Sequence, residues 1–139
     1  LEGAPGVEEV RVEPGRGGLV VHVRLGPVRD LRRAYLALEE RAAEVLKERP
    51  VRIEIHDSRS PDLDERMDRL RFAVEEGIST GRYLTMREEL AKEAASLGVE
   101  GYRVSVDERF VYVQLHDGES FLYELFSRDR RSAGGGGAS

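Results

Sequence analysis

The chain has 139 residues, of which 40% are hydrophobic and 35% are charged, a balance typical of one globular domain or two small ones. Its 27 acidic residues exceed its 22 basic ones, and without a basic block the net charge of −5 argues against a nucleic-acid partner. The absence of cysteine excludes disulfides, thiolate metal sites and cysteine nucleophiles. No apolar run approaches the roughly 18 residues of a transmembrane helix, so we expect this piece to be soluble.

The beginning of the chain predicts a hairpin of two strands. In residues 7–13, Val10 and Val12 alternate with charged residues, and the run LVVHVRL from Leu19 alternates again. The glycine-rich stretch between them lacks the GK[ST] sequence of a phosphate-binding loop and precedes a strand, so we interpret it as the hairpin loop. Period two places His22 on the more polar face of the second strand.

A helix and a third strand follow the hairpin. The helix is indicated by an apolar stripe at three- and four-residue spacing, formed by Leu31, Tyr35, Leu38, Ala42 and Val45. In VRIEIH, residues 51–56, the apolar positions point one way, and Arg52, Glu54 and His56 point the other. The two histidines His22 and His56 are therefore expected on the same kind of surface.

The second half of the chain predicts two helices and three strands. Ser60-Pro61-Asp62 supplies an N-cap, a proline and an acid for a first helix, and Gly77 is its expected stop. Thr85-Met86-Arg87-Glu88 matches a capping box, which predicts another helix that Gly98 ends. From Tyr102 onward the period changes to two and indicates a three-stranded meander, with His116 as a solvated residue of its second turn.

These patterns indicate an α+β fold of order ββαβ, then αα, then βββ. We divide the chain into a first module of residues 1–60, an accessory module of residues 61–131 and a flexible tail of residues 132–139. A module of about 60 residues buries too small a fraction of its surface to be very stable alone. We therefore expect the accessory module to dock on the first.

The first 60 residues resemble the cytoplasmic C-terminal domain of cation diffusion facilitator transporters, which are proton-coupled exporters of divalent ions such as zinc, iron and manganese. The resemblance rests on Pro5-Gly6-Val7 before a short strand, Arg11, the glycine-rich hairpin, VVHVRL, and VRIEIHD after the helix. It implies a ferredoxin-like, metallochaperone-like ββαβ unit that forms a homodimer in the cytoplasm. It also implies membrane attachment only through a transporter segment upstream of Leu1.

The resemblance also implies a metal site. His22 and His56 fall on two histidine positions of the family, Asp57 lies near its carboxylate, one residue closer, and Glu8 or Glu9 replaces an early histidine. Because Tyr35 replaces a further family histidine, we expect a single site with His22, His56, Asp57 and Glu9 as its ligands. Imidazoles with carboxylates suit Zn²⁺, Mn²⁺ or Fe²⁺, and since the histidines must be neutral, affinity should weaken below about pH 6.5.

Two functions from different classes remain open. The first is a soluble, cytoplasmic, metal-responsive dimerisation domain of a divalent cation efflux transporter. The second is a ferredoxin-like protein-interaction or assembly module without a metal site, in which the histidines are ordinary surface residues. An enzyme is not expected, because the consecutive residues His56, Asp57 and Ser58 point apart in an extended chain and cannot converge as a catalytic triad does.

Overall fold

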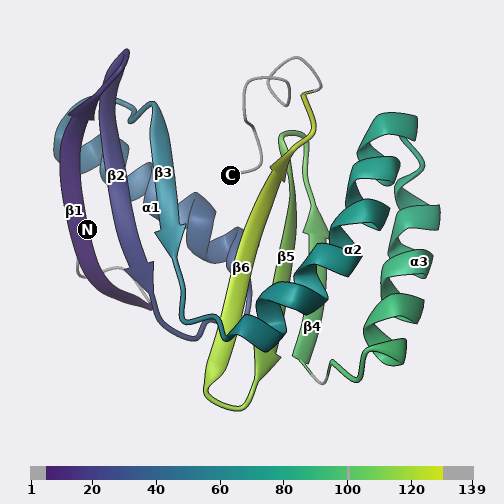
Figure 1. The fold of residues 1–139 in the computed structure, drawn as a ribbon. Coiled ribbons are helices and arrows are strands. Elements are labelled where there is room, and N and C mark those ends of the chain that lie inside the picture. The colour runs from purple at the N-terminus through teal and green to yellow at the C-terminus, as the bar shows by residue number, and fades with distance from the viewer. Residues whose placement is uncertain (1–5, 100, 130–139) are drawn as a thin grey trace. The chain divides into compact units, whose positions relative to one another are not determined.

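The computed structural model describes residues 6–99 and 101–129, so the predicted tail at 132–139 lies outside the described residues. The chain divides into two compact units, Leu1–Asp57 and Ser58–Ser139, each with its own three-stranded sheet (Figure 1). The order of strands and helices is the predicted one, and the α+β class is confirmed. Docking of the second part on the first stays a prediction.

The first unit is a ββαβ arrangement. It consists of β1 (Val7–Gly15), β2 (Gly18–Leu25), α1 (Leu31–Leu46) and β3 (Arg52–His56). β1 pairs with β2 in the antiparallel sense and β2 with β3 in the parallel sense, so β2 is central. Only residues 16 and 17 connect β1 to β2, which confirms the hairpin interpretation and gives strands longer than the sequence pattern indicated.

The sheet of the first unit has one apolar and one polar face. Val21, Val23 and Leu25 are fully buried on one face, as alternation predicts. Helix α1 begins after Asp30, whose side chain accepts a hydrogen bond from the Arg33 N–H, and it buries Leu31, Tyr35, Leu38 and Ala42. Val45 is instead 55% exposed, because the helix ends one residue later at Leu46, where Lys47 takes a left-handed conformation.

The second unit places two helices on one face of an antiparallel meander. Its elements are α2 (Pro61–Thr80), α3 (Tyr83–Ser96), β4 (Gly101–Val106), β5 (Phe110–Asp117) and β6 (Ser120–Ser127). Figure 1 shows α2 and α3 side by side, and the core joins helix residues such as Leu70 and Leu90 to strand residues such as Val113 and Leu122.

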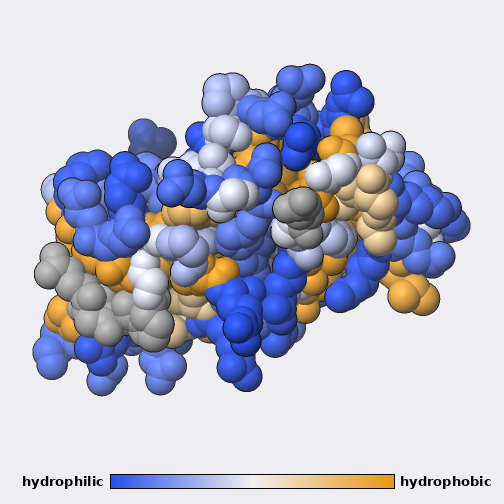
Figure 2. All heavy atoms as spheres, turned by 90° about the horizontal axis from the view of Figure 1, so that it is seen from below, coloured by the Kyte–Doolittle hydropathy of each residue, from blue (hydrophilic) through white to orange (hydrophobic). Residues whose placement is uncertain are grey.

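Charged and polar side chains cover most of the molecular face drawn in Figure 2, while hydrophobic residues appear there in separate areas.

Two predicted helix boundaries in the second unit are wrong. Helix α2 continues through Gly77, which is buried, and ends at Gly81, whose φ of 74° provides the left-handed cap. Helix α3 begins at Tyr83, with Arg82 as its N-cap, so Thr85 lies inside the helix and caps nothing. Helix α2 extends to Thr80, so residues 81 and 82 alone connect the two helices.

Other predicted features of this unit have mixed outcomes. Ser60 caps α2 by accepting a hydrogen bond from the Leu63 N–H. Gly98 ends α3 as expected, with a φ of 71° and the Val99 N–H donating to the Ala94 carbonyl. The expectation for His116 is wrong, because this residue belongs to β5, is half-buried and stacks on the Phe121 ring at 6.1 Å between centroids.

Candidate metal centre

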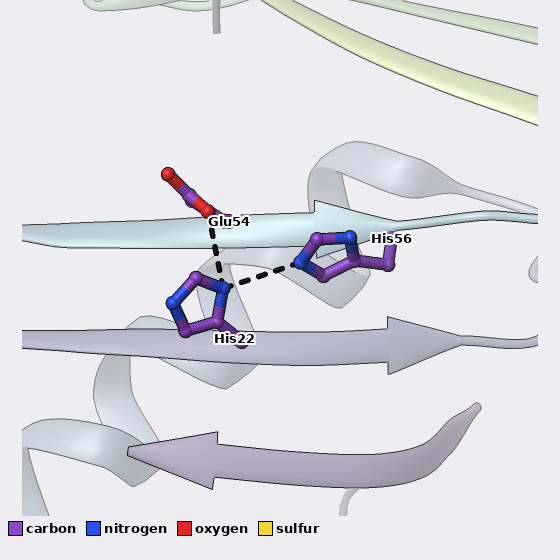
Figure 3. Close-up of side chains that lie close together, drawn as sticks. All are labelled: His22, Glu54 and His56. Carbon is purple, nitrogen blue, oxygen red and sulfur yellow. Dashed lines mark hydrogen bonds and ion pairs between the residues drawn. The ribbon is translucent and has the colours of Figure 1, made fainter. Parts of the chain in front are cut away.

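The parallel pairing of β2 and β3 brings two histidines and a glutamate together on the polar face of the first sheet. His22 in β2 lies directly opposite Glu54 in β3, and His56 is two residues further along β3 on the same face. Figure 3 shows the imidazoles of His22 and His56 approaching each other, with the Glu54 carboxylate beside them. The close approach of His22, Glu54 and His56 therefore depends on the register in which β2 pairs with β3.

Two of the separations between the potential ligand atoms of these residues are close to those of metal ligands. Nδ1 of His22 lies 3.2 Å from Nε2 of His56 and 3.0 Å from Oε2 of Glu54. Two ligands of a tetrahedral zinc ion with bonds of about 2.0–2.1 Å are separated by about 3.3–3.4 Å. Among the described residues, His22, Glu54 and His56 form a group whose ligand atoms all lie within 4.8 Å of one another. The three residues are therefore candidates to hold one ion together.

A further carboxylate holds the opposite nitrogen of the His22 ring. Oε1 of Glu13 lies 2.8 Å from Nε2 of His22, and Oε2 of the same carboxylate lies 2.6 Å from the Arg11 guanidinium. The hydrogen bond with His22, followed by that from Arg11, lowers the pKa of Glu13 below its usual value. Glu13 therefore stays ionised and acts only as a hydrogen-bond acceptor.

Glu54 is also oriented by an arginine. The Arg52 Nε lies 2.9 Å from Oε1 of Glu54, while Oε2 faces His22. This leaves Glu54 one oxygen to offer to an ion. The His22 side chain is only 12% exposed beneath these neighbours, whereas His56 is exposed. An ion held by the three residues would thus keep a coordination position open toward solvent on the His56 side.

The structure brings together two of the four predicted ligands. His22 and His56 meet, but the group of close ligand atoms contains neither Glu9 nor Asp57. The Glu9 carboxylate lies 3.9 Å from the Arg24 guanidinium, and Asp57 follows the last residue of β3. The carboxylate of Glu8, the alternative to Glu9, lies against Gly26.

Glu54 and Glu13 are the residues of this centre that sequence reasoning missed. Alternation had already placed Glu54 on the face of His56, so the strand pattern contained the signal for this ligand. Glu13 could be found only from the hairpin register, which pairs Arg11 with His22 and places Glu13 two pairs closer to the turn, on the same face of the sheet. Predicting that register requires knowing how many residues the hairpin loop contains.

Comparisons with protein-family models, with curated proteins and with solved structures found no match to this chain. Within the described residues, none of the helices has the length and hydropathy needed to span a membrane. The chemistry of the His22, Glu54 and His56 group is thus the feature of the molecule from which a function can be argued.

Proposed function

We propose that the first unit is a metal-responsive dimerisation domain of a divalent cation efflux transporter, and that it binds its ion through His22, Glu54 and His56. The observation that supports this proposal is the spacing of 3.0 and 3.2 Å from Nδ1 of His22 to the other two ligand atoms. The resemblance of residues 1–60 to the cytoplasmic domain of such transporters agrees with it. The role is binding, and no catalytic step is proposed.

Zinc is the ion that best fits this ligand set. Two imidazole nitrogens and one carboxylate oxygen form a borderline set that suits Zn²⁺, with Fe²⁺ and Mn²⁺ as weaker candidates. Calcium and magnesium prefer oxygen ligands alone, and calcium takes six to eight of them. Because Arg52 occupies one oxygen of Glu54, the site supplies a single protein oxygen, which disfavours both ions.

An open site of this kind suits sensing. Three protein ligands leave the fourth position of a tetrahedral zinc ion to water or to another group, so binding is weaker and more exchangeable than at a closed four-ligand site. A group from a second copy of the chain could take that position. The ion would then bind the dimer more tightly than the monomer. It would stabilise the dimer by the difference between these two binding free energies.

A protein-interaction module without a metal remains the alternative. Its support is that arginines and glutamates on the same polar face pair with each other without an ion, as Arg11 does with Glu13 and Arg52 with Glu54. A charged sheet face organised in this way could also receive another protein. The two functions differ in whether the histidines bind metal, which is directly measurable.

Zinc titration calorimetry at pH 7.5 tests the proposed ion binding. We expect one zinc per chain for the wild type, and for His22→Ala, His56→Ala and Glu54→Ala a loss of affinity on the order of 100-fold or more, because removal of a ligand should exceed the 10- to 100-fold cost of losing a supporting residue. His116→Ala is the matched control, since this histidine lies in the other unit, and it should bind as the wild type does. No zinc binding by the wild type, or equal binding by all variants, would support the interaction module.

Light scattering at tens of micromolar protein tests the dimerisation. We expect a mass near twice 15.6 kDa in the presence of zinc and a larger monomer fraction when a chelator removes the ion. The His56→Ala variant should behave as the chelated wild type does. A strict monomer both with and without zinc would contradict the dimerisation role.

A further inference from the structure

Glu13 limits where the proton of a neutral His22 can lie. A neutral imidazole carries one N–H, on either Nδ1 or Nε2. Nε2 of His22 lies 2.8 Å from Oε1 of Glu13, and an ionised carboxylate can only accept a hydrogen bond. The contact is therefore favourable when the proton is on Nε2, and this tautomer leaves the lone pair on Nδ1.

The lone pair on Nδ1 points into the group of ligand atoms. Oε2 of Glu54 and Nε2 of His56 lie 3.0 and 3.2 Å from Nδ1 of His22. Electron-pair donors that converge this closely repel one another unless a proton or a metal ion lies between them. In the metal-free chain the His56 ring can supply that proton, because its Nε2–H can donate to Nδ1 of His22. Glu13 thus directs toward the centre the nitrogen that a metal needs.

Glu13 is itself held in place on both sides. One oxygen meets His22, and the other lies 2.6 Å from the Arg11 guanidinium. Glu13 and Arg11 belong to β1, whereas the ligands belong to β2 and β3. The hairpin therefore contributes an orienting residue to a site whose ligands come from the other two strands.

We infer that Glu13 is the positioning residue of this centre, which fixes the Nε2–H tautomer of His22 so that Nδ1 faces the ion. The inference rests on the proposed function for its metal, but the tautomer itself is a property of the metal-free protein. Metal-bound histidines commonly donate their second N–H to a carboxylate, which fixes the ring and raises its basicity. Loss of such a partner typically lowers metal affinity by about 10- to 100-fold.

The test is long-range ¹H–¹⁵N NMR of the histidine rings at pH 8, which identifies the protonated nitrogen, combined with zinc titration of the same samples. We expect His22 of the wild type to be the Nε2–H tautomer without metal and to bind zinc through Nδ1. Glu13→Ala should give a mixture of tautomers and a zinc affinity about 10- to 100-fold lower. Glu13→Gln keeps an acceptor oxygen and should restore the tautomer and part of the affinity.

Glu9→Ala is the matched control, because Glu9 lies on the same face of the same strand but outside the group of ligand atoms. It should change neither the tautomer nor the zinc affinity. An Nδ1–H tautomer in the wild type, or a Glu13→Ala variant unchanged in both readouts, would overturn the inference. A Glu13-dependent Nε2–H tautomer in a protein that binds no zinc would support the positioning role and contradict the proposed function instead.

Discussion

Gly77 of α2 lies so close to Met86 of α3 that a Cβ atom at position 77 would be 2.7 Å from the Cβ, Cγ and Sδ atoms of the methionine. Real Cβ atoms essentially never approach other atoms this closely. The close approach of the two helices at this point therefore requires a glycine, although glycine is a poor residue for the interior of a helix.

We predict that Gly77→Ala destabilises the protein. Alanine normally stabilises a helix by about 1 kcal/mol relative to glycine, but overpacking of this kind costs about 1–3 kcal/mol. A net loss of up to about 2 kcal/mol should be seen in urea unfolding. The double variant Gly77→Ala/Met86→Ala should cost less than the sum of the single changes, since the shorter side chain makes room for the methyl group. A stabilised Gly77→Ala variant would contradict the close packing.

Two tyrosines of the second unit should respond oppositely to loss of their hydroxyl groups. The Tyr102 hydroxyl is buried without a hydrogen-bond partner among the described residues, and burial raises its pKa. The Tyr112 hydroxyl donates to Oδ2 of Asp107 at 2.6 Å. Burial tends to raise the pKa of Asp107, but the hydrogen bonds from Tyr112 and from the backbone of Phe110 and Arg109 outweigh it and lower the pKa.

We therefore expect Tyr102→Phe to stabilise the protein, by up to about 1 kcal/mol, because it removes an unsatisfied buried hydroxyl. Tyr112→Phe should destabilise it by about 1.5–3 kcal/mol, because a hydrogen bond to a charged group is lost. Thermal unfolding of the two variants beside the wild type measures both effects. Melting temperatures that change in the same direction for both variants would contradict this assignment of the hydroxyl groups.

His116 should make stability depend on pH. Burial lowers the pKa of His116 below the ordinary value, so the folded chain binds this proton less readily than the unfolded chain. The stability that comes from keeping His116 neutral is complete above the unfolded pKa, about 6.5. It is lost as the pH falls from there through the folded pKa.

The measurement is urea unfolding of the wild type and His116→Gln at pH 7.5 and pH 5, with a chelator present to exclude metal effects. We expect the free energy of unfolding to fall more for the wild type than for the variant between these two conditions. Equal losses would show that His116 is as accessible to protons in the folded chain as in the unfolded one, which would contradict its partial burial beneath Phe121.

Local sequence patterns predict the α+β class and the order of the strands and helices. Alternation in LVVHVRL and VRIEIH placed His22 and His56 on polar strand faces, and the observed contact of 3.2 Å follows from the parallel pairing of these strands. The Ser60 cap and the glycine stop at Gly98 were also readable, since each acts within one helical turn.

What could not be read from the sequence depends on contacts between distant residues. The sequence predicts Gly77 as a helix stop, but the structure shows that this glycine makes room for Met86, and no local pattern reveals that. The family resemblance implies Asp57 and Glu9 as the carboxylates of the site, whereas strand alternation places Glu54 on the face of His56. The position of Glu13 beside His22 follows from the hairpin register. The glycine-rich sequence of the loop does not determine that register.

The central claim is that His22, Glu54 and His56 hold one divalent ion. It is tested most directly by zinc K-edge X-ray absorption on chain loaded with one equivalent of zinc, because the scattering pattern of imidazole rings counts the histidines bound to each ion. We predict two imidazoles and further oxygen ligands at about 2.0–2.2 Å in the wild type, one imidazole in His22→Ala and in His56→Ala, and two in His116→Ala. A wild-type zinc ion with no imidazole ligands, or an imidazole count that falls only in His116→Ala, would contradict the claim.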